Sequence, residues 1–179
     1  LGGNLSLKWL GENAKKASQF VRKAVAFSVP LHLSSSSQQL TRWENRLYTH
    51  RFLQTLLEKV TEKSARYPMD ITPSMLTSIR SLYDFDNVIT GPLHGFKDAE
   101  EYYERNSSLY FLANIQVPTL IVNAKNDPFL SQECLPEQID SDFVQIELPD
   151  SGGHCGFYPR NYRGQTWAEQ RAAAWFNGN

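Results

Sequence analysis

The sequence predicts an α/β fold in which a parallel β-sheet is flanked by helices. Three short apolar segments have the composition of buried strands, at residues 24–29, 117–124 and 143–148, and helical segments separate them. Strands that are joined through helices pair in parallel, because a tight turn can connect only antiparallel neighbours. Pro30 follows the first apolar segment and ends it.

The spacing of apolar residues predicts the helices in order along the chain. Dense apolar positions indicate a helix through residues 1–18 that is buried against the sheet. From residue 39 to residue 66, apolar side chains recur every three to five positions with charged residues between them, which is typical of an amphipathic helix. Residues 99–107 and 166–176 are predicted to form two further helices, and the four serines at 34–37 a loop that caps a helix start.

Composition and charge exclude several classes of protein. Hydrophobic residues make up 41% of the chain and charged residues 21%, which is ordinary for a globular domain. The net charge of -1 gives no electrostatic reason to expect nucleic acid as a partner, and it does not indicate membrane contact. No apolar stretch approaches the roughly 20 residues that a transmembrane helix needs.

The cysteines and histidines predict neither a disulfide framework nor a metal site. Cys134 and Cys155 form no Cys-x-x-Cys pair, which favours a reducing, cytoplasmic setting. His32, His50 and His94 show no mutual ligand spacing. We therefore expect no metal and no cofactor.

Two residues with the chemistry of a hydrolase follow neighbouring predicted strands. Asp127 comes after the strand that ends at residue 124, and His154 after the strand that ends at residue 148. Because the carboxyl ends of parallel strands meet at one rim of the sheet, we expect the two side chains to lie close together. A carboxylate that orients a histidine supplies two of the three roles in a catalytic triad. An Asp-Pro turn and a histidine in a glycine-rich loop are each common as purely structural features, so the prediction depends on the pair.

Several other residues are alternatives to this pair. Asp150 is a rival for the acid, but it lies on the same loop as the histidine, so Asp127 is favoured. Cys155 follows His154 directly, and adjacent residues on one loop rarely direct their side chains at each other, which disfavours a Cys–His pair. Ser6 is predicted inside a helix and Ser28 inside a strand, so neither has the setting of a nucleophile.

The beginning of the chain and several later segments resemble a known family. Leu1-Gly2-Gly3-Asn4 resembles the end of a nucleophile elbow, G-x-S-x-G, with the serine immediately before Leu1. Over nearly the whole chain the sequence resembles the YheT-like branch of α/β-hydrolases, which includes bacterial esterases and eukaryotic membrane-linked acylglycerol and phospholipid hydrolases. The segments that carry this resemblance are Ser81–Asp86, Gly95-Phe96, Tyr102-Tyr103, Pro118–Ile121, Asp127–Phe129 and Gly153–Phe157.

The resemblance implies the C-terminal part of an α/β-hydrolase fold with a helical cap insertion. Residues 1–34 and 113–179 would belong to the core and residues 35–112 to the cap. The aromatic side chains of the cap would either line an acyl pocket or form its interior, and they are Trp43, Phe52, Tyr83, Phe85, Tyr102 and Tyr103.

The resemblance also implies roles for individual residues. Asp127 would be the triad acid, His154 the general base, and the backbone N–H of Leu1 a donor in the oxyanion hole. The activity would be that of a serine carboxylester hydrolase acting on a small-molecule or lipid ester. Acyl transfer to an alcohol by the same triad and a non-catalytic binding module are the alternatives.

The serine, the first elbow glycine and the upstream strands of that family are absent from this sequence, which starts with Leu instead of Met. We therefore expect a C-terminal portion whose fold is completed by an upstream part of the same polypeptide. The strand edge near residues 25–29 should be covered by such a segment or exposed.

Overall fold

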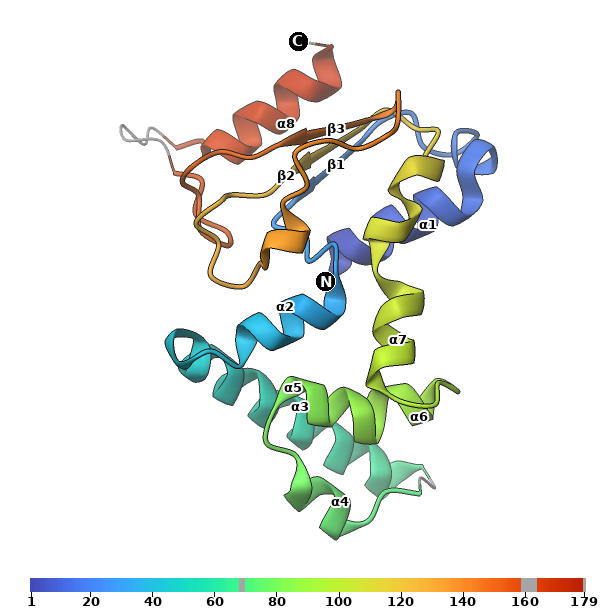
Figure 1. The fold of residues 1–179 in the computed structure, drawn as a ribbon, viewed down its shortest axis with the longest axis vertical. Coiled ribbons are helices and arrows are strands. Elements are labelled where there is room, and N and C mark those ends of the chain that lie inside the picture. The colour runs from blue at the N-terminus through green and yellow to red at the C-terminus, as the bar shows by residue number, and fades with distance from the viewer. Residues whose placement is uncertain (68–69, 159–163, 179) are drawn as a thin grey trace. The chain divides into compact units, whose positions relative to one another are not determined.

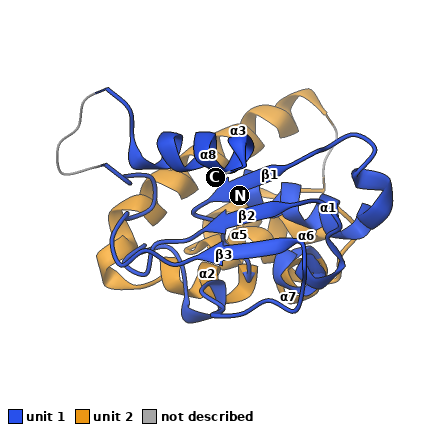
Figure 2. Ribbon diagram, turned by 90° about the horizontal axis from the view of Figure 1, so that it is seen from above, with its two compact units in different colours: residues 1–32, 106–179 blue, residues 33–105 orange. Residues whose placement is uncertain are grey.

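The computed structural model describes residues 1–67, 70–158 and 164–178, and the chain divides into two compact units (Figure 2). The first, which we call the sheet unit, comprises Leu1–His32 and Asn106–Asn179. The second, the helical unit, comprises Leu33–Arg105. The interpretation of the helical unit as a cap stays a prediction.

The sheet unit contains a three-stranded parallel sheet. Its strands are β1 (Ala24–Phe27), β2 (Thr119–Val122) and β3 (Val144–Glu147), in the spatial order β1-β2-β3. Both pairings are parallel, with Val25 opposite Leu120. The predicted α/β class and the parallel sheet are therefore confirmed, with strands that are shorter than the apolar segments suggested.

Helices cover both faces of this sheet (Figure 1). Helix α1 (Gly2–Ala17) packs Leu7 and Leu10 into the cluster that contains Ile121 of β2. Helix α8 (Trp167–Asn177) packs Trp175 against the opposite side. Successive side chains of β2 point to opposite faces of the sheet. Because a helix packs against each face, all residues of this strand are buried.

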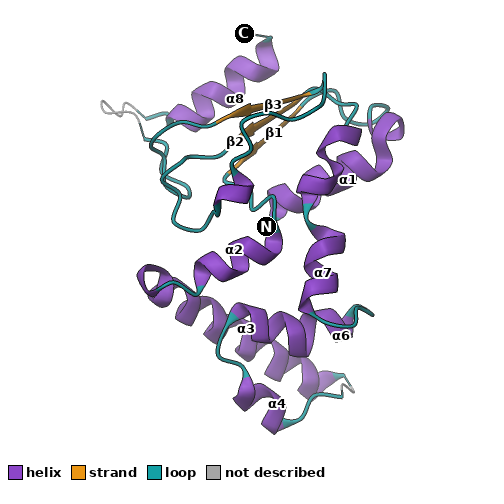
Figure 3. Cartoon of the chain, in the orientation of Figure 1, coloured by secondary structure: helices purple, strands orange, loops and turns teal. Residues whose placement is uncertain are grey.

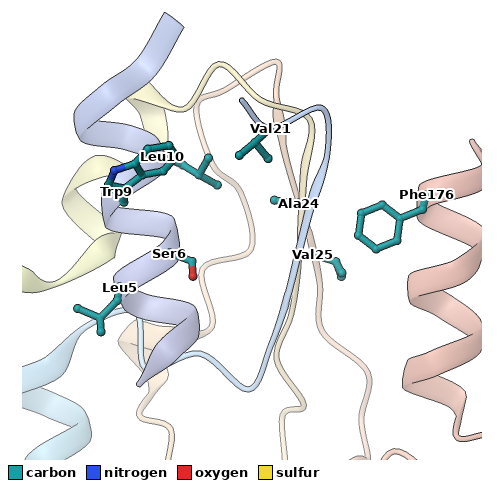
Figure 4. Close-up of a pocket in the computed structure, with 8 residues that line it drawn as sticks. All are labelled: Leu5, Ser6, Trp9, Leu10, Val21, Ala24, Val25 and Phe176. Atoms are coloured by element: carbon teal, nitrogen blue, oxygen red, sulfur yellow. The ribbon is translucent and has the colours of Figure 1, made fainter. Parts of the chain in front are cut away.

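One edge of the sheet carries an apolar groove. Within the described residues β1 pairs only with β2, so its other edge has no neighbouring strand. A groove of about 560 Å³ runs beside that edge, between α1 and α8 (Figure 4). Neither residue of the predicted Asp–His pair lines it. The lining residues are Leu5, Ser6, Trp9, Leu10, Val21, Ala24, Val25 and Phe176.

The helical unit contains helices and connecting loops, and its described residues include no strand (Figure 3). Its core is formed by Leu53, Val60, Ile79, Phe85 and Ile89. The elements are α2 (Leu33–Leu40), η1 (Trp43–Asn45), α3 (Arg46–Arg66), α4 (Pro73–Ser78), α5 (Leu82–Phe85), η2 (Asp86–Thr90), α6 (Gly91–Leu93) and α7 (Ala99–Asn106). Two short 3-10 helices, η3 (Ser108–Asn114) and η4 (Gln132–Cys134), belong to the sheet unit.

The prediction that serines 34–37 form a loop is wrong, because all four lie inside α2. Ser36 and Ser37 are buried, and Ser37 Oγ lies 3.1 Å from the hydroxyl oxygen of Tyr103, within hydrogen-bond distance. Small side chains let this helix pack closely, and tertiary packing outweighs the modest helix propensity of serine.

The helix that was predicted to begin at residue 39 is instead broken after Leu40. Asn45 Nδ2 donates to the carbonyl of Gln39 over 3.1 Å, and Thr41 Oγ1 donates to the carbonyl of Gln38 over 2.7 Å. These polar side chains satisfy carbonyls that a continuing helix would use, so α2 ends and α3 starts in a new direction. No helix in the described part of the chain is long and apolar enough to cross a membrane.

The carboxyl group of Asp86 in the helical unit is partly buried, and its titration affects stability. Asp86 Oδ2 accepts a hydrogen bond from the Tyr103 hydroxyl over 2.7 Å. Burial raises the pKa of Asp86, and hydrogen bonds from Thr90 and Tyr103 only partly oppose that shift. A raised pKa in the folded state means that stability is greatest below the unfolded pKa and falls as pH rises through the folded pKa.

We therefore expect Asp86→Asn, which retains an acceptor oxygen but cannot ionise, to be more stable than the parent at pH 7. This difference should shrink below about pH 4, where the parent carboxyl is protonated in both states. Thermal unfolding midpoints across that pH range measure the effect, and exposed Asp70→Asn serves as the control. A variant that is less stable than its parent at pH 7 would contradict the argument.

Candidate active site

Asp127 is fixed on the loop that follows β2. Its backbone N–H donates to the carbonyl of Ala124 over 3.1 Å, and its Oδ1 accepts from the N–H of Phe129 over 2.9 Å. This turn, with Pro128 at its centre, uses one carboxylate oxygen to hold the backbone and leaves Oδ2 for another partner. The residue is only 4% exposed, so the carboxylate is withdrawn from water.

His154 completes the pair from the loop after β3. Its Nδ1 lies 2.9 Å from Asp127 Oδ2, and the imidazole is 35% exposed while the carboxylate side chain is fully buried. The carboxylate can only accept here, so Nδ1 carries the proton and donates it. Nε2 is then the nitrogen that can take a proton from another group. The structure thus brings together the two residues that the sequence singled out.

Asn126 is a further residue of this site that the sequence reasoning missed. Its Oδ1 accepts hydrogen bonds from the N–H groups of both Gly152 and Gly153, over 3.0 and 2.9 Å. Gly153 has a φ of +57°, a conformation that glycine adopts without strain. The available signal was an asparagine beside an Asp-Pro turn, since its side chain readily bonds backbone N–H groups. The Asp127 loop therefore holds the His154 loop at two points besides the carboxylate.

The other candidate residues from the sequence do not contact the imidazole of His154 in the bonds described here. Asp150 is exposed, and its Oδ1 accepts from Lys125 Nζ over 2.7 Å, which lowers the pKa of that carboxyl. It is paired with a lysine and not with the imidazole. Ser6 donates within α1 to the carbonyl of Gly2 over 2.9 Å. Ser28 lies just beyond β1 with a φ of +53°, not within the strand as predicted.

The histidines and cysteines form no metal site among the residues that the structure describes, because no group of three or more His, Cys, Asp or Glu side chains could hold an ion. His32 Nε2 lies 3.0 Å from the hydroxyl of Tyr110. Cys134 is buried and Cys155 is exposed, and neither forms a disulfide.

Leu1 lies at the amino-terminal end of α1, as the residue just before its first turn. The first turn of α1 packs tightly, because a Cβ on Gly3 would approach Val29 Cγ2 to 2.7 Å. A helix amino terminus presents N–H groups and a partial positive charge, which suit an oxyanion.

The aromatic side chains of the helical unit do not share one environment. Phe85 and Tyr103 are buried, in two different core clusters, whereas Trp43 is 76% exposed. The groove of Figure 4 is lined by other residues. The acyl pocket therefore stays a prediction.

A parallel α/β sheet with an Asp–His pair at its carboxyl rim is the arrangement of α/β-hydrolases. The chain is 33% identical over 180 residues to the proposed esterase YheT of Escherichia coli, an alignment that covers 98% of this chain. It is 29% identical to a monoacylglycerol lipase of Saccharomyces cerevisiae over 93% of this chain, and 30% identical to human monoacylglycerol lipase ABHD2 over 88%. This chain belongs to the α/β-hydrolase family, on the branch of YheT and these lipases.

The chain spans about half or less of the length of these relatives, namely 52% of YheT, 38% of the yeast lipase and 41% of the human one. No family model and no solved structure matches it.

The hydrogen bonds of Asn126 can be tested directly. We expect Asn126→Ala to speed exchange of the Gly152 and Gly153 amide protons, since both lose their acceptor. Lys125→Ala is the matched control and should leave the exchange of both amides unchanged, since its exposed ion pair with Asp150 makes no bond to either glycine. Unchanged exchange in Asn126→Ala would show that the loop is held by other contacts.

Proposed function

We propose that this chain carries the acid, the base and part of the oxyanion hole of a serine carboxylester hydrolase that acts on lipid esters. The observation that carries the proposal is the 2.9 Å contact between His154 Nδ1 and a fully buried Asp127 carboxylate. The lipid substrate is supported by relatives named monoacylglycerol lipases.

In this proposal the nucleophile is a serine that immediately precedes Leu1 in the intact polypeptide. Nε2 of His154 takes the serine proton as Oγ attacks the acyl carbonyl, and the resulting oxyanion accepts from the N–H of Leu1. The imidazolium then protonates the departing alcohol, which leaves an acyl-serine. Water attacks this ester with His154 again as base, so that the acid is released and the serine is restored. Asp127 keeps the imidazole in the required tautomer throughout.

The place of Leu1 at the start of α1 supports that placement of the serine, because a nucleophile elbow is a turn that leads into a helix. An acceptor alcohol in place of water would turn the same steps into acyl transfer.

We also propose that an upstream segment of the polypeptide extends the sheet at β1. Two observations support it: the free edge of β1 among the described residues, and the apolar groove of about 560 Å³ beside that edge. An unpaired strand edge flanked by exposed apolar side chains is unfavourable in water.

Removal of either triad member tests the reaction in the intact protein. His154→Ala should lower kcat by several orders of magnitude, and Asp127→Asn by about 10⁴-fold through the wrong tautomer. Asp150→Asn is the matched control and should leave turnover within about twofold, since that carboxylate is exposed and paired with a lysine. Ester hydrolysis rates and the mass of a fluorophosphonate adduct on the upstream serine are the measurements. Near-normal turnover in His154→Ala would overturn the proposal.

Amide exchange tests the extended sheet separately. The N–H groups of Ala24 and Ser28 donate to the carbonyls of Pro118 and Val122, on the side of β2. Successive N–H groups point to opposite edges of a strand, so those of Val25 and Phe27 point to the free edge. In the intact protein we expect the Val25 and Phe27 amides to be protected as strongly as that of Ala26. Rapid exchange at both positions would mean that no strand pairs there.

A further inference from the structure

The first turn of α1 is anchored by one polar side chain. Leu1 and Leu5 are 65% and 56% exposed, whereas Asn4 between them is fully buried. The apolar side chains that pack α1 into the core of the sheet unit come from later turns. Gly3 lies close to Val29, but a van der Waals contact of that kind has no direction. The orientation of this turn therefore depends on the bonds of Asn4.

The amide of Asn4 forms two hydrogen bonds to the backbone of one segment. Its Nδ2 donates to the carbonyl of Asn106 over 2.8 Å, and its Oδ1 accepts from the N–H of Ser108 over 2.8 Å. Paired bonds to a planar amide fix both the position and the rotation of the side chain. Neither bond is easily given up, because a buried polar group without a partner is costly.

The segment that receives these bonds is itself held in place. With Asn106 the chain re-enters the sheet unit, and the N–H of Leu109 donates to the carbonyl of Leu31 over 3.0 Å. Farther along α1, a Cβ on Gly11 would lie 2.3 Å from the carbonyl oxygen of Phe111, so the helix and this segment are in close contact there too. The segment is therefore a firm support to which Asn4 ties the start of the helix.

We propose that Asn4 is a positioning residue of the esterase, which fixes the place of the Leu1 N–H and of the serine that would precede it. Asn4 is three positions from Leu1, within one helical turn, and the N–H of Leu5 donates to the Leu1 carbonyl over 3.1 Å. A shift of this turn moves the oxyanion donor and the nucleophile together, away from the place where the oxyanion forms. The inference rests on the proposed function, because it needs the serine and Leu1 in the roles given there.

The test compares the intact parent with Asn4→Leu, which has a similar volume but forms neither bond. We expect kcat to fall about 10- to 100-fold with KM within about twofold, because the two displaced groups act in the transition state. Rates are expressed per serine that a fluorophosphonate labels at completion, so that unfolded molecules do not count. The Ser108 amide proton should also exchange faster, since it loses its acceptor.

Thr119→Val is the matched control. Thr119 is fully buried as well, and its Oγ1 donates to the carbonyl of Val117 over 2.7 Å. It stands at the amino end of β2, whereas the loop that carries Asp127 follows the carboxyl end. The control variant loses a buried hydrogen bond and should unfold at a lower temperature, but its kcat per labelled serine should stay within about twofold of the parent value.

Asn4→Asp is a more conservative variant that separates the two bonds. An ionised carboxylate still accepts from the Ser108 N–H but repels the carbonyl of Asn106, whereas a protonated carboxyl can donate to that carbonyl. Burial raises the pKa of the introduced carboxyl. The kcat of this variant relative to the parent should therefore rise as pH falls through that pKa. A ratio that is the same at every pH would overturn the inference, also where Asn4→Leu does not fold.

Two further results would overturn it. One is a kcat per labelled serine in Asn4→Leu within about twofold of the parent value, because Asn4 would then only stabilise the fold. The other is unchanged exchange of the Ser108 amide proton, which would show that its bond to Asn4 does not hold the segment. A parent that neither hydrolyses esters nor takes up the fluorophosphonate would instead overturn the proposed function, and the exchange measurement would still report on the Asn4 bonds.

Discussion

The geometry of the sheet unit depends on the buried side chain of Asn123, at the carboxyl end of β2. Its Oδ1 accepts from the N–H of Val29 over 2.7 Å, and its Nδ2 donates to the carbonyls of Val29 and Cys134 over 2.9 and 2.7 Å. One amide thus joins the chain leaving β1, the end of β2 and the short helix η4. A fully satisfied amide in the interior specifies one arrangement, whereas an apolar side chain would permit several. The loops that carry Asp127 and His154 begin from this fixed rim.

Burial at that rim gives the Asp–His pair its chemical character. The Asp127 carboxylate has no exposed surface, and its two oxygens are used by the Phe129 N–H and by the imidazole. In such surroundings an ionic hydrogen bond is stronger than in water, and the ring cannot rotate without leaving the carboxylate unsatisfied. The ring of Phe129 lies 4.6 Å from that of His154, centroid to centroid, and limits its motion from the other side. The imidazole of His154 is therefore held in one orientation by its neighbours on this rim.

Sequence patterns predicted the features that follow from where a residue stands relative to the end of a strand. They did not predict the features that depend on contacts between side chains. The parallel sheet and the meeting of Asp127 with His154 followed from apolar runs and from the rule that functional groups gather at strand ends. The role of Asn126 did not, because its partners Gly152 and Gly153 become neighbours only after β2 and β3 pair. The helical state of serines 34–37 was missed for a similar reason, since Tyr103 and other distant residues stabilise it. The exposure of Trp43 could not be predicted from the sequence either, because an amphipathic pattern does not show which of its apolar residues remain exposed to solvent.

The insertion of the helical unit between β1 and β2 has a consequence for how the chain folds. Val29 and Asn123, which bond through the amide described above, are 94 positions apart. Closing so long a loop costs conformational entropy before the strand contacts that offset this cost have formed. Such non-local pairing slows folding. Contacts inside the helical unit are local by comparison and can form first. Once it is compact, its two ends are connected by a folded body instead of a flexible loop, and the entropy that opposes sheet closure is much reduced. Folding of the helical unit would then set the rate at which the Asp–His pair is assembled.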